Sequence, residues 1–302
     1  RIIDNLGEVT ILNREEFIRQ DLIKAPGQGC GAMINRQPAS SNYFTPENFR
    51  GQSGRSYSLE IFFQDGRSYK SRLEPMPKAQ GIDSILVEYN TLPSASVSQP
   101  VTGLDIFAVW QEDPSEMNFY TWELGGIYRI KTPPIPGQCC IYDPREPGIV
   151  DDCWVIESRL EGTIKSFDDR LINGTAAIQK VGFLEDDGLR FSGENVSVEQ
   201  QYYVEVTQYA INQVAHTFYQ SIETLSEIDG EIFDPPPVNA RGNIFSLEDP
   251  NELVVGLFDV RSKSIKGRFI NQRLLPEVKK RSVCGDCRAF FKGQIETPEP
   301  YQ

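Results

Sequence analysis

The chain has 302 residues and a net charge of −13, and charged residues make up 24% of its length. A surface this acidic repels phosphate backbones and anionic lipid headgroups, which excludes nucleic acid as a partner. No apolar run approaches the roughly 20 residues that cross a bilayer as a helix. The chain carries 12 Tyr, 17 Phe and 3 Trp among 20 Pro and 24 Gly, a composition that favours β-strands joined by turns.

The beginning of the sequence predicts an N-terminal β-sandwich. GEVTIL, near the start, is expected to form a strand, whereas IKAPGQGCGAMINRQPASSN is expected to be a loop. SYSLEIFFQDGRSYKSRL, residues 56–73, predicts a hairpin that turns at Asp65-Gly66. Its first strand alternates with a period of two, which predicts one buried face. The residues on that face are Tyr57, Leu59, Ile61 and Phe63.

A polar, proline-containing stretch, EPMPKAQG at residues 74–81, predicts a domain boundary. We therefore expect a mainly β protein of two domains. Residues 1–76 are interpreted as an Ig-like or transthyretin-like β-sandwich whose first strand is missing. Residues 77–302 are interpreted as a larger β-rich domain that carries one main α-helix. The sequence begins with Arg1 and lacks a signal-peptide pattern, so we expect a mature product with any leader or lipid-anchor site upstream.

The larger domain is expected to contain several strands and one helix. The helix is predicted at about residues 212–228, with Asn212 as its N-cap and a widened apolar stripe at helical spacing. The stripe comprises Val214, Ala215, Phe218, Tyr219, Ile222, Leu225 and Ile228. The predicted strands are DSILVEYN, LDIFAVWQ, NFYTWELGGIYRI, ENVSVEQQYYVEVTQYAI, NELVVGLFDVRS and SIKGRFINQ.

Six cysteines are compatible with disulfides formed in an oxidising compartment. They are Cys30, Cys139, Cys140, Cys153, Cys284 and Cys287. CGDC, at residues 284–287, could also be a redox dithiol or half of a zinc site, but we favour structural disulfides that pin the long loop and the tail. Our pairing links Cys284 to Cys287, and it ties Cys153 and Cys30 to the Cys139-Cys140 doublet.

The candidates for catalysis are weak. The only histidine, His216, lies inside the predicted helix and is interpreted as a surface or half-buried residue. Paired acids at Asp151-Asp152, Asp168-Asp169 and Asp186-Asp187 could bind calcium or serve in hydrolysis, but we interpret them as solvated turn residues. No catalytic, cofactor-binding or metal-binding residue is therefore assigned, and we expect no enzyme activity and no cofactor.

Two long stretches resemble the Bacteroidota lipoproteins grouped as the domain-of-unknown-function 4249 family. They are FRGQSGRSYSLEIFFQDGRSYKSRLEPMPKAQGIDSI and YYVEVTQYAINQVAHTFYQSIETLSEIDGEIFDPPPVNARGNIFSLEDPNELVVGLFDV. Cys153 before Trp154, and CGDC, are similar to further features of the family. The resemblance implies a lipid-anchored protein of the outer membrane, exposed at the cell surface and encoded beside a SusC-like TonB-dependent transporter. It also implies no established enzymatic activity.

The leading hypothesis is a non-enzymatic accessory subunit of such a transporter, which captures substrate, gates the barrel or stabilises the assembly together with other outer-membrane lipoproteins. The membrane is contacted only through the upstream anchor. The consecutive prolines are expected mainly to carry the chain rigidly from the helix to the next strand, since they hold an extended conformation. A candidate partner-docking segment within this stretch comprises Phe233, Pro235, Pro236 and Pro237. The alternative is an independent glycan- or peptide-binding module in which Trp110, Trp122 and Trp154 form a stacking surface. We expect these three side chains to fill the sandwich core instead.

Overall fold

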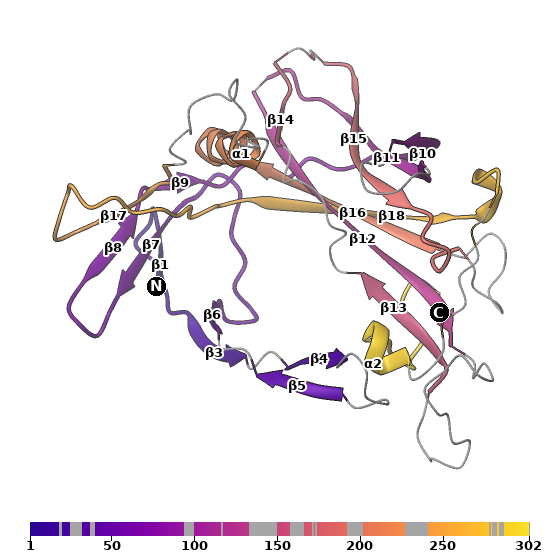
Figure 1. The fold of residues 1–302 in the computed structure, drawn as a ribbon. Helices are drawn as coiled ribbons and strands as arrows, with labels where there is room; N and C mark the ends of the chain where they lie inside the picture. The colour runs from indigo at the N-terminus through magenta and orange to yellow at the C-terminus, as the bar shows by residue number, and fades with distance from the viewer. Residues whose placement is uncertain are drawn as a thin grey trace, which may run out of the picture.

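A computed structural model gives the arrangement of the chain (Figure 1). It describes residues 1–17, 20–24, 32–36, 40–93, 100–115, 117–132, 150–157, 166–170, 172, 174–191, 202–226, 241–277, 279, 283 and 287–301; between 13 and 42 it describes the strands alone. The protein is mainly β, with several antiparallel sheets and one main helix, as the sequence predicts.

The N-terminal sheet is antiparallel and contains six strands in the order β17-β8-β7-β1-β2, with β9 also paired to β7. The Asp65-Gly66 hairpin is confirmed, because Gly66 has a φ of 93° and Phe63 N–H donates to the Arg67 carbonyl across the turn. The strands are β1 (Ile2–Asp4), β2 (Val9–Thr10), β7 (Ser56–Phe62), β8 (Ser68–Ser71), β9 (Glu74–Pro75) and β17 (Ile244–Ser246).

The prediction of one buried apolar face on β7 is confirmed at Tyr57 and is wrong for the rest of that face. Ser58 and Glu60 are buried, whereas Leu59 and Ile61 are half-buried and Phe63 is exposed. The burial of Glu60 has a physical cause, because β7 is a central strand and the Glu60 carboxylate pairs with Arg1, which precedes β1, and with Lys70 on β8. Neither face of β7 is covered along its whole length, because Tyr57 on the predicted face is buried and Phe62, on the same face as Ser58 and Glu60, is exposed.

The segment predicted as a loop contains strands. The antiparallel pairs are β3 (Asn13–Phe17) with β6 (Ser40–Phe44) and β4 (Gln20–Lys24) with β5 (Ala32–Arg36). The register of β4 and β5 sets Leu22 opposite Ile34 and Ile23 opposite Met33. These short apolar pairs favour a ladder despite the prolines and glycines around them, which explains why the prediction of a loop is wrong.

The rest of the chain forms a two-layer β-sandwich. One layer has the order β10-β11-β15, and the other has the order β13-β12-β16-β18 with β14 beside β12. The strands of the first layer are β10 (Ser84–Leu92), β11 (Val101–Gln111) and β15 (Ala176–Glu185). Those of the second are β12 (Phe119–Lys131), β13 (Asp152–Glu157), β14 (Ser166–Asp168), β16 (Tyr202–Ile211) and β18 (Ser262–Ile270).

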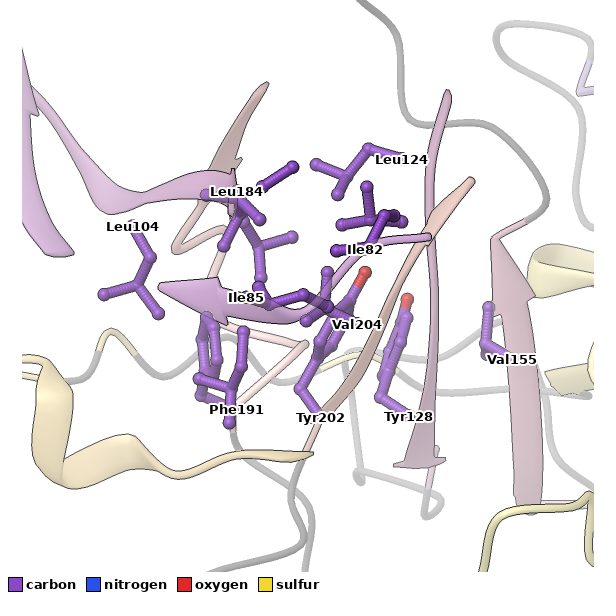
Figure 2. Close-up of a cluster of buried hydrophobic side chains, with 14 of the residues drawn as sticks. Ile82, Ile85, Leu104, Leu124, Tyr128, Val155, Leu184, Phe191, Tyr202 and Val204 are labelled. Carbon is purple, nitrogen blue, oxygen red and sulfur yellow. The ribbon is translucent and has the colours of Figure 1, made fainter. Parts of the chain in front are cut away.

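The main core lies between these two layers (Figure 2). Leu104 and Leu184 from one layer face Val204 and Tyr202 from the other, and all four side chains are buried. The Tyr202 ring lies over Gly126, where an added Cβ would come within 2.0 Å of the Tyr202 hydroxyl. A glycine at 126 is therefore what allows the aromatic ring to cross its own sheet.

Helix α1 (Gln213–Ser226) covers one end of the second layer. Asn212 is its N-cap, as predicted, because its Oδ1 accepts a hydrogen bond of 2.9 Å from Ala215 N–H. The contact face is rotated from the predicted stripe: Ala215 and His216 are buried, whereas Val214 and Leu225 are exposed. The helix approaches the sheet through its small residue. The remaining short helices are η2 (Gln272–Leu274) and α2 (Cys287–Phe291).

A buried polar joint connects the N-terminal sheet to the helix and to β17. The Glu74 carboxylate accepts from Asn212 Nδ2 at 2.8 Å and from Asn243 Nδ2 at 2.9 Å. Residues beyond 240 thus complete the sheet formed by residues 1–75, because β17 pairs with β8. The domain division at residue 76 stays a prediction. Among the described helices, none is both long and apolar enough to cross a bilayer.

The strand predicted over NELVVGLFDVRS is wrong for residues 251–261, which form no ladder, whereas β18 begins at Ser262. Figure 1 shows the chain turning beyond β17 and coming back alongside it toward β18. We call residues 253–257 the return segment.

Candidate interaction surface

The β7–β8 hairpin and β17 expose apolar side chains on one face of the N-terminal sheet, at the left of Figure 1. Phe62 is 59% exposed, and Phe245 and Leu247 are also exposed. We call Phe62, Phe245 and Leu247 the hairpin patch. A neighbouring aromatic, Phe63, is exposed on the opposite face of the hairpin, where its ring packs edge-on against Tyr69.

The strand register explains why these three side chains share a face. Ser68 lies opposite Phe62 on one side and accepts from Leu247 N–H at 3.0 Å on the other. Directly opposite residues point to the same face of a sheet. Phe62 and Leu247 are therefore separated by two strand spacings, about 10 Å. Phe245, on β17, lies two residues before Leu247 and opposite Lys70, and therefore points to the same face.

Ion-paired side chains border the hairpin patch. The Glu60 carboxylate receives Arg1 Nε at 2.7 Å and Lys70 Nζ at 3.1 Å. The hydrogen bond from Arg1 is the main cause that lowers the pKa of Glu60. The Arg1 guanidinium also lies 5.1 Å from the centre of the Phe62 ring. The patch is thus an apolar surface with an ion-paired rim, the arrangement typical of protein interfaces.

The loop after β17 is fastened to the hairpin by acidic side chains. Glu248 accepts from the N–H and the hydroxyl of Ser68, and these bonds lower its pKa. Glu252 accepts from the Tyr69 hydroxyl at 2.8 Å, which raises the pKa of Tyr69. The donors are neutral, so the negative charges of this loop are held in place without being neutralised.

The sequence predicted docking at Phe233, Pro235, Pro236 and Pro237, which lie outside the described residues. The hairpin patch was not predicted, although a signal for it existed. Phe62 and Phe63 are adjacent on a strand, and adjacent side chains on a strand point to opposite faces. One of the two was bound to lie on the face that the predicted core does not cover.

The predicted cysteine pairing is wrong where the structure describes it. Cys153 on β13 forms a disulfide with Cys287 on α2, with their Cα atoms 6.0 Å apart. Cys287 is therefore not bonded to Cys284, and Cys153 is not bonded to the Cys139-Cys140 doublet. The adjacent Trp154 exchanges backbone hydrogen bonds with Gln294, so the bond fastens the tail against the edge of the sandwich. Cys30, Cys139, Cys140 and Cys284 lie outside the described residues.

Two of the acids predicted to be solvated are buried. Asp186 accepts from Gly188 N–H and from Lys279 N–H, and Asp169 accepts from Asn118 N–H at 2.9 Å. Backbone donors replace the water that a turn carboxylate would otherwise bind. The neighbouring acids are in ion pairs, as in the Arg129–Asp152 contact of 2.7 Å. These groups organise turns, and they do not converge on one centre.

His216 is buried, and the prediction of a surface or half-buried residue is wrong. Its ring packs 4.7 Å from the Phe119 ring, and its Nε2 lies 3.7 Å from Asp168 Oδ2. Burial lowers the pKa of His216 despite the nearby carboxylate, which itself is paired with Arg170. Among the described residues nothing bonds to its Nδ1. The neutral imidazole with its hydrogen on Nε2 fits this site. Its N–H then points toward Asp168, and only the acceptor lone pair of Nδ1 is left without a partner among these residues.

A second buried polar group lies beneath α1. The Tyr219 hydroxyl donates to Asp259 at 2.8 Å, and Arg261 lies 3.8 Å from the same carboxylate. Burial raises the pKa of Asp259. Arg261 also stacks 3.8 Å from the centre of the Tyr209 ring. The group couples the helix to the sheet and to the residues that follow the return segment.

The tryptophans do not form the exposed stacking surface of the alternative hypothesis, and the expectation that they fill the core is confirmed for Trp110 and Trp154. Trp110 and Trp154 are buried, and Trp122 is half-buried with its indole N–H donating to Gln208 at 2.9 Å. Trp110 packs against the Tyr120 and Phe167 rings, so this aromatic set fills the sandwich core.

The structure offers little that could hold a cofactor or a metal. In the described part of the chain, no three His, Cys, Asp or Glu side chains come together as metal ligands. A concave region of about 550 Å³ lies against β1 and β2, lined by Asp4, Glu8 and Arg55 among others. Its charges are mutually satisfied, since Arg55 lies 2.6 Å from both carboxylates.

These features define a class: an acidic, mainly β protein with a packed sandwich and an apolar patch on a separate sheet edge. A family model described as Domain of unknown function (DUF4249) matches residues 16–266, and the chain belongs to this family. No curated protein and no solved structure matches the chain.

Proposed function

We propose that this protein is a non-enzymatic accessory subunit of a SusC-like TonB-dependent transporter in the outer membrane of Bacteroidota. It is lipid-anchored, it is exposed at the cell surface, and it acts on the barrel by capturing substrate, by gating or by stabilising the assembly. Membership of the DUF4249 family supports this proposal, because the resemblance that the sequence shows to such lipoproteins extends through the matched residues 16–266.

The hairpin patch is the observation that carries the proposal. Phe62, Phe245 and Leu247 present apolar surface on a sheet whose register fixes their spacing. Aromatic side chains that are already ordered lose little conformational entropy when a partner covers them. Such anchors dominate the energy of protein interfaces, at about 2 kcal/mol or more for the central ones.

The patch fits a protein partner better than a glycan. Recognition of sugars by stacking generally uses Trp or Tyr, whose polar atoms bond to hydroxyls, but the tryptophans lie in the core. Phenylalanine and leucine offer no such polar atom. Binding of a glycan by the isolated protein is thus the outcome that would favour an independent binding module.

The test is co-isolation from detergent-solubilised outer membranes, with the tagged full-length protein and the double variant Phe62→Ser/Phe245→Ser. A TonB-dependent transporter should co-isolate with the wild type and should be depleted about tenfold or more with the variant, since each ~1.4 kcal/mol is a factor of ten. Ile178→Ser is the matched control, because Ile178 on β15 is 59% exposed, as is Phe62. If no transporter accompanies the wild type, or if both variants lose it equally, the proposal fails.

A further inference from the structure

The return segment has the composition of a strand but no strand partner. Its sequence, LVVGL, is rich in β-favouring residues. Leu253 is 63% exposed and Val255 is 72% exposed. None of the residues that the structure describes forms a hydrogen bond with the backbone of residues 253–257. On the side of β17 the Gly256 carbonyl lies against Gly242, so the backbone groups on the opposite side are the ones left for water or for another chain.

The segment is held at both ends. On one side, Glu252 N–H donates to the Asp249 carbonyl at 3.1 Å, and the Glu252 carboxylate binds Tyr69. On the other side, Leu257 packs against the cluster of Phe119, Ile211 and Ala215 beneath α1. Because both ends are fixed, the segment is ordered before any partner arrives, and the entropic cost of adding a strand is small.

The contacts of Phe258 indicate which backbone groups face outward. Its N–H donates to Asn243 Oδ1 at 2.8 Å, and its C=O accepts from Asn243 Nδ2 at 2.9 Å, so both point toward β17. Successive residues of an extended chain point their backbone groups to alternate sides. The groups of Leu253, Val255 and Leu257 therefore face away from β17, where a new strand can reach them.

The charges near the segment specify what kind of strand it accepts. The turn before it contains Glu248, Asp249 and Glu252, whose carboxylates bind neutral donors on Ser68, Asn251 and Tyr69. This end of the segment is consequently negative. An incoming strand gains electrostatic energy if it carries Lys or Arg where it passes the turn.

We infer that the return segment is a docking edge: an extended segment of the partner protein, apolar in alternate positions and basic at one end, adds to it as a β-strand. The mode is strand addition, in which main-chain hydrogen bonds supply affinity and side chains supply selectivity. The inference rests on the proposed function, because it names how the transporter is bound. It also adds the backbone of residues 253–257 to the apolar anchors of the hairpin patch.

The test is hydrogen–deuterium exchange of the full chain, alone and in the complex isolated with the transporter from outer membranes. Alone, the amides of Leu253, Val255 and Leu257 should exchange rapidly; in the complex, exchange should slow about tenfold or more, as expected for amides that enter a ladder. A complex that depends on Phe62 but leaves these amides unprotected overturns the inference and leaves the proposed function intact. Protection that rises with protein concentration without the transporter means that a second copy of the chain is the occupant, and it also overturns the inference.

Proline variants separate backbone pairing from side-chain contact. Val255→Pro removes an outward N–H that bonds to none of the described residues, so folding should be retained. Co-isolation should fall about tenfold, because proline cannot donate to a ladder. Val254→Pro is the control, since its N–H points toward β17, and it should change co-isolation less than about threefold. Equal retention of the transporter by the two variants contradicts the proposed geometry.

The charge of the occupant has its own test. Glu248→Gln/Asp249→Asn keeps the hydrogen-bond acceptors of the turn and removes two charges. This variant should slow association about threefold or more at low salt and should match the wild type at high salt, where screening removes the attraction. Association that is insensitive to both the variant and the salt contradicts a basic partner strand.

Discussion

The large sandwich and the N-terminal sheet use similar residues in opposite ways. In the sandwich, Leu104, Ile106 and Trp110 are completely buried between two layers. In the N-terminal sheet, Ser58 and Glu60 are buried on β7 whereas Phe62 of the same strand is exposed. The sandwich places its apolar surface where it stabilises the fold, and the hairpin places it where another molecule can cover it. From this difference we propose that stability and binding are located in separate parts of this protein.

The largest effect should come from Trp110→Ala. Trp110 is completely buried against Tyr120 and Phe167, so its removal leaves a cavity that the neighbouring rings cannot fill. We expect a loss of about 3–5 kcal/mol in the free energy of unfolding, measured in urea. Phe62→Ala is the control and should stay within about 0.5 kcal/mol of the wild type. Similar losses in the two variants would break the comparison between the two regions.

The second-largest loss of stability should come from removing the disulfide that holds the C-terminal tail. The disulfide between Cys153 and Cys287 closes a loop with a sequence separation of 134 residues. Cys153→Ser/Cys287→Ser should lower the unfolding free energy by about 2–5 kcal/mol, since the unfolded chain regains the entropy of the open loop. A peptide map under non-reducing conditions checks the bond itself; Cys287 found linked to Cys284 would contradict the structure.

A smaller effect is expected at the joint between the two regions. Asn212→Ala removes the cap of α1 and one donor to the buried Glu74 carboxylate, at a cost of about 1–2 kcal/mol. Asn212→Ser keeps an acceptor for Ala215 N–H and should lose less. A cost that is equal for the two substitutions would show that the cap contributes little.

The smallest effect is a loss of stability that is expected only at acidic pH. Burial lowers the pKa of His216 below its ordinary value of 6.5, so the unfolded state binds a proton more readily than the folded state does. Stability should therefore be complete above pH 6.5 and should fall as the pH drops below it, with a slope of at most about 1.4 kcal/mol per pH unit. His216→Phe keeps a ring against Phe119 and should remove this part of the slope. Parallel curves for the two proteins between pH 5 and 7, roughly the range in which histidine titrates, would contradict the burial of a neutral imidazole.

The sequence predicted β10, β11, β12, β16 and β18 of the sandwich, but it did not predict β13, β14 or β15. β16 is buried at every second residue along most of its length, and the C-terminal parts of β11 and β12 follow the same period. Residues 213–226 carry a capped helical pattern. The rotated contact face of α1 could not be predicted, because Ala215 packs by being small and His216 by losing its charge. Hydrophobicity indicates neither property.

The remaining errors have a common cause in contacts between distant residues. LVVGL has the propensity of a strand, but a ladder requires a partner strand, and none of the residues that the structure describes supplies one. Cys153 pairs across 134 residues, a distance on which local spacing carries no information. The hairpin patch was missed because alternation shows that Phe62 and Phe63 point to opposite faces, but it does not show which face is covered.

The most direct test of the central claim is photo-crosslinking in intact cells, with a photoreactive amino acid in place of Phe62 or, separately, of Ile178. Both positions are 59% exposed, one in the hairpin patch and the other on the sandwich. We predict a crosslink from position 62 to a TonB-dependent transporter and none from position 178. Crosslinks of equal yield at the two positions, or a transporter captured from position 178 alone, would contradict the location of binding on the hairpin.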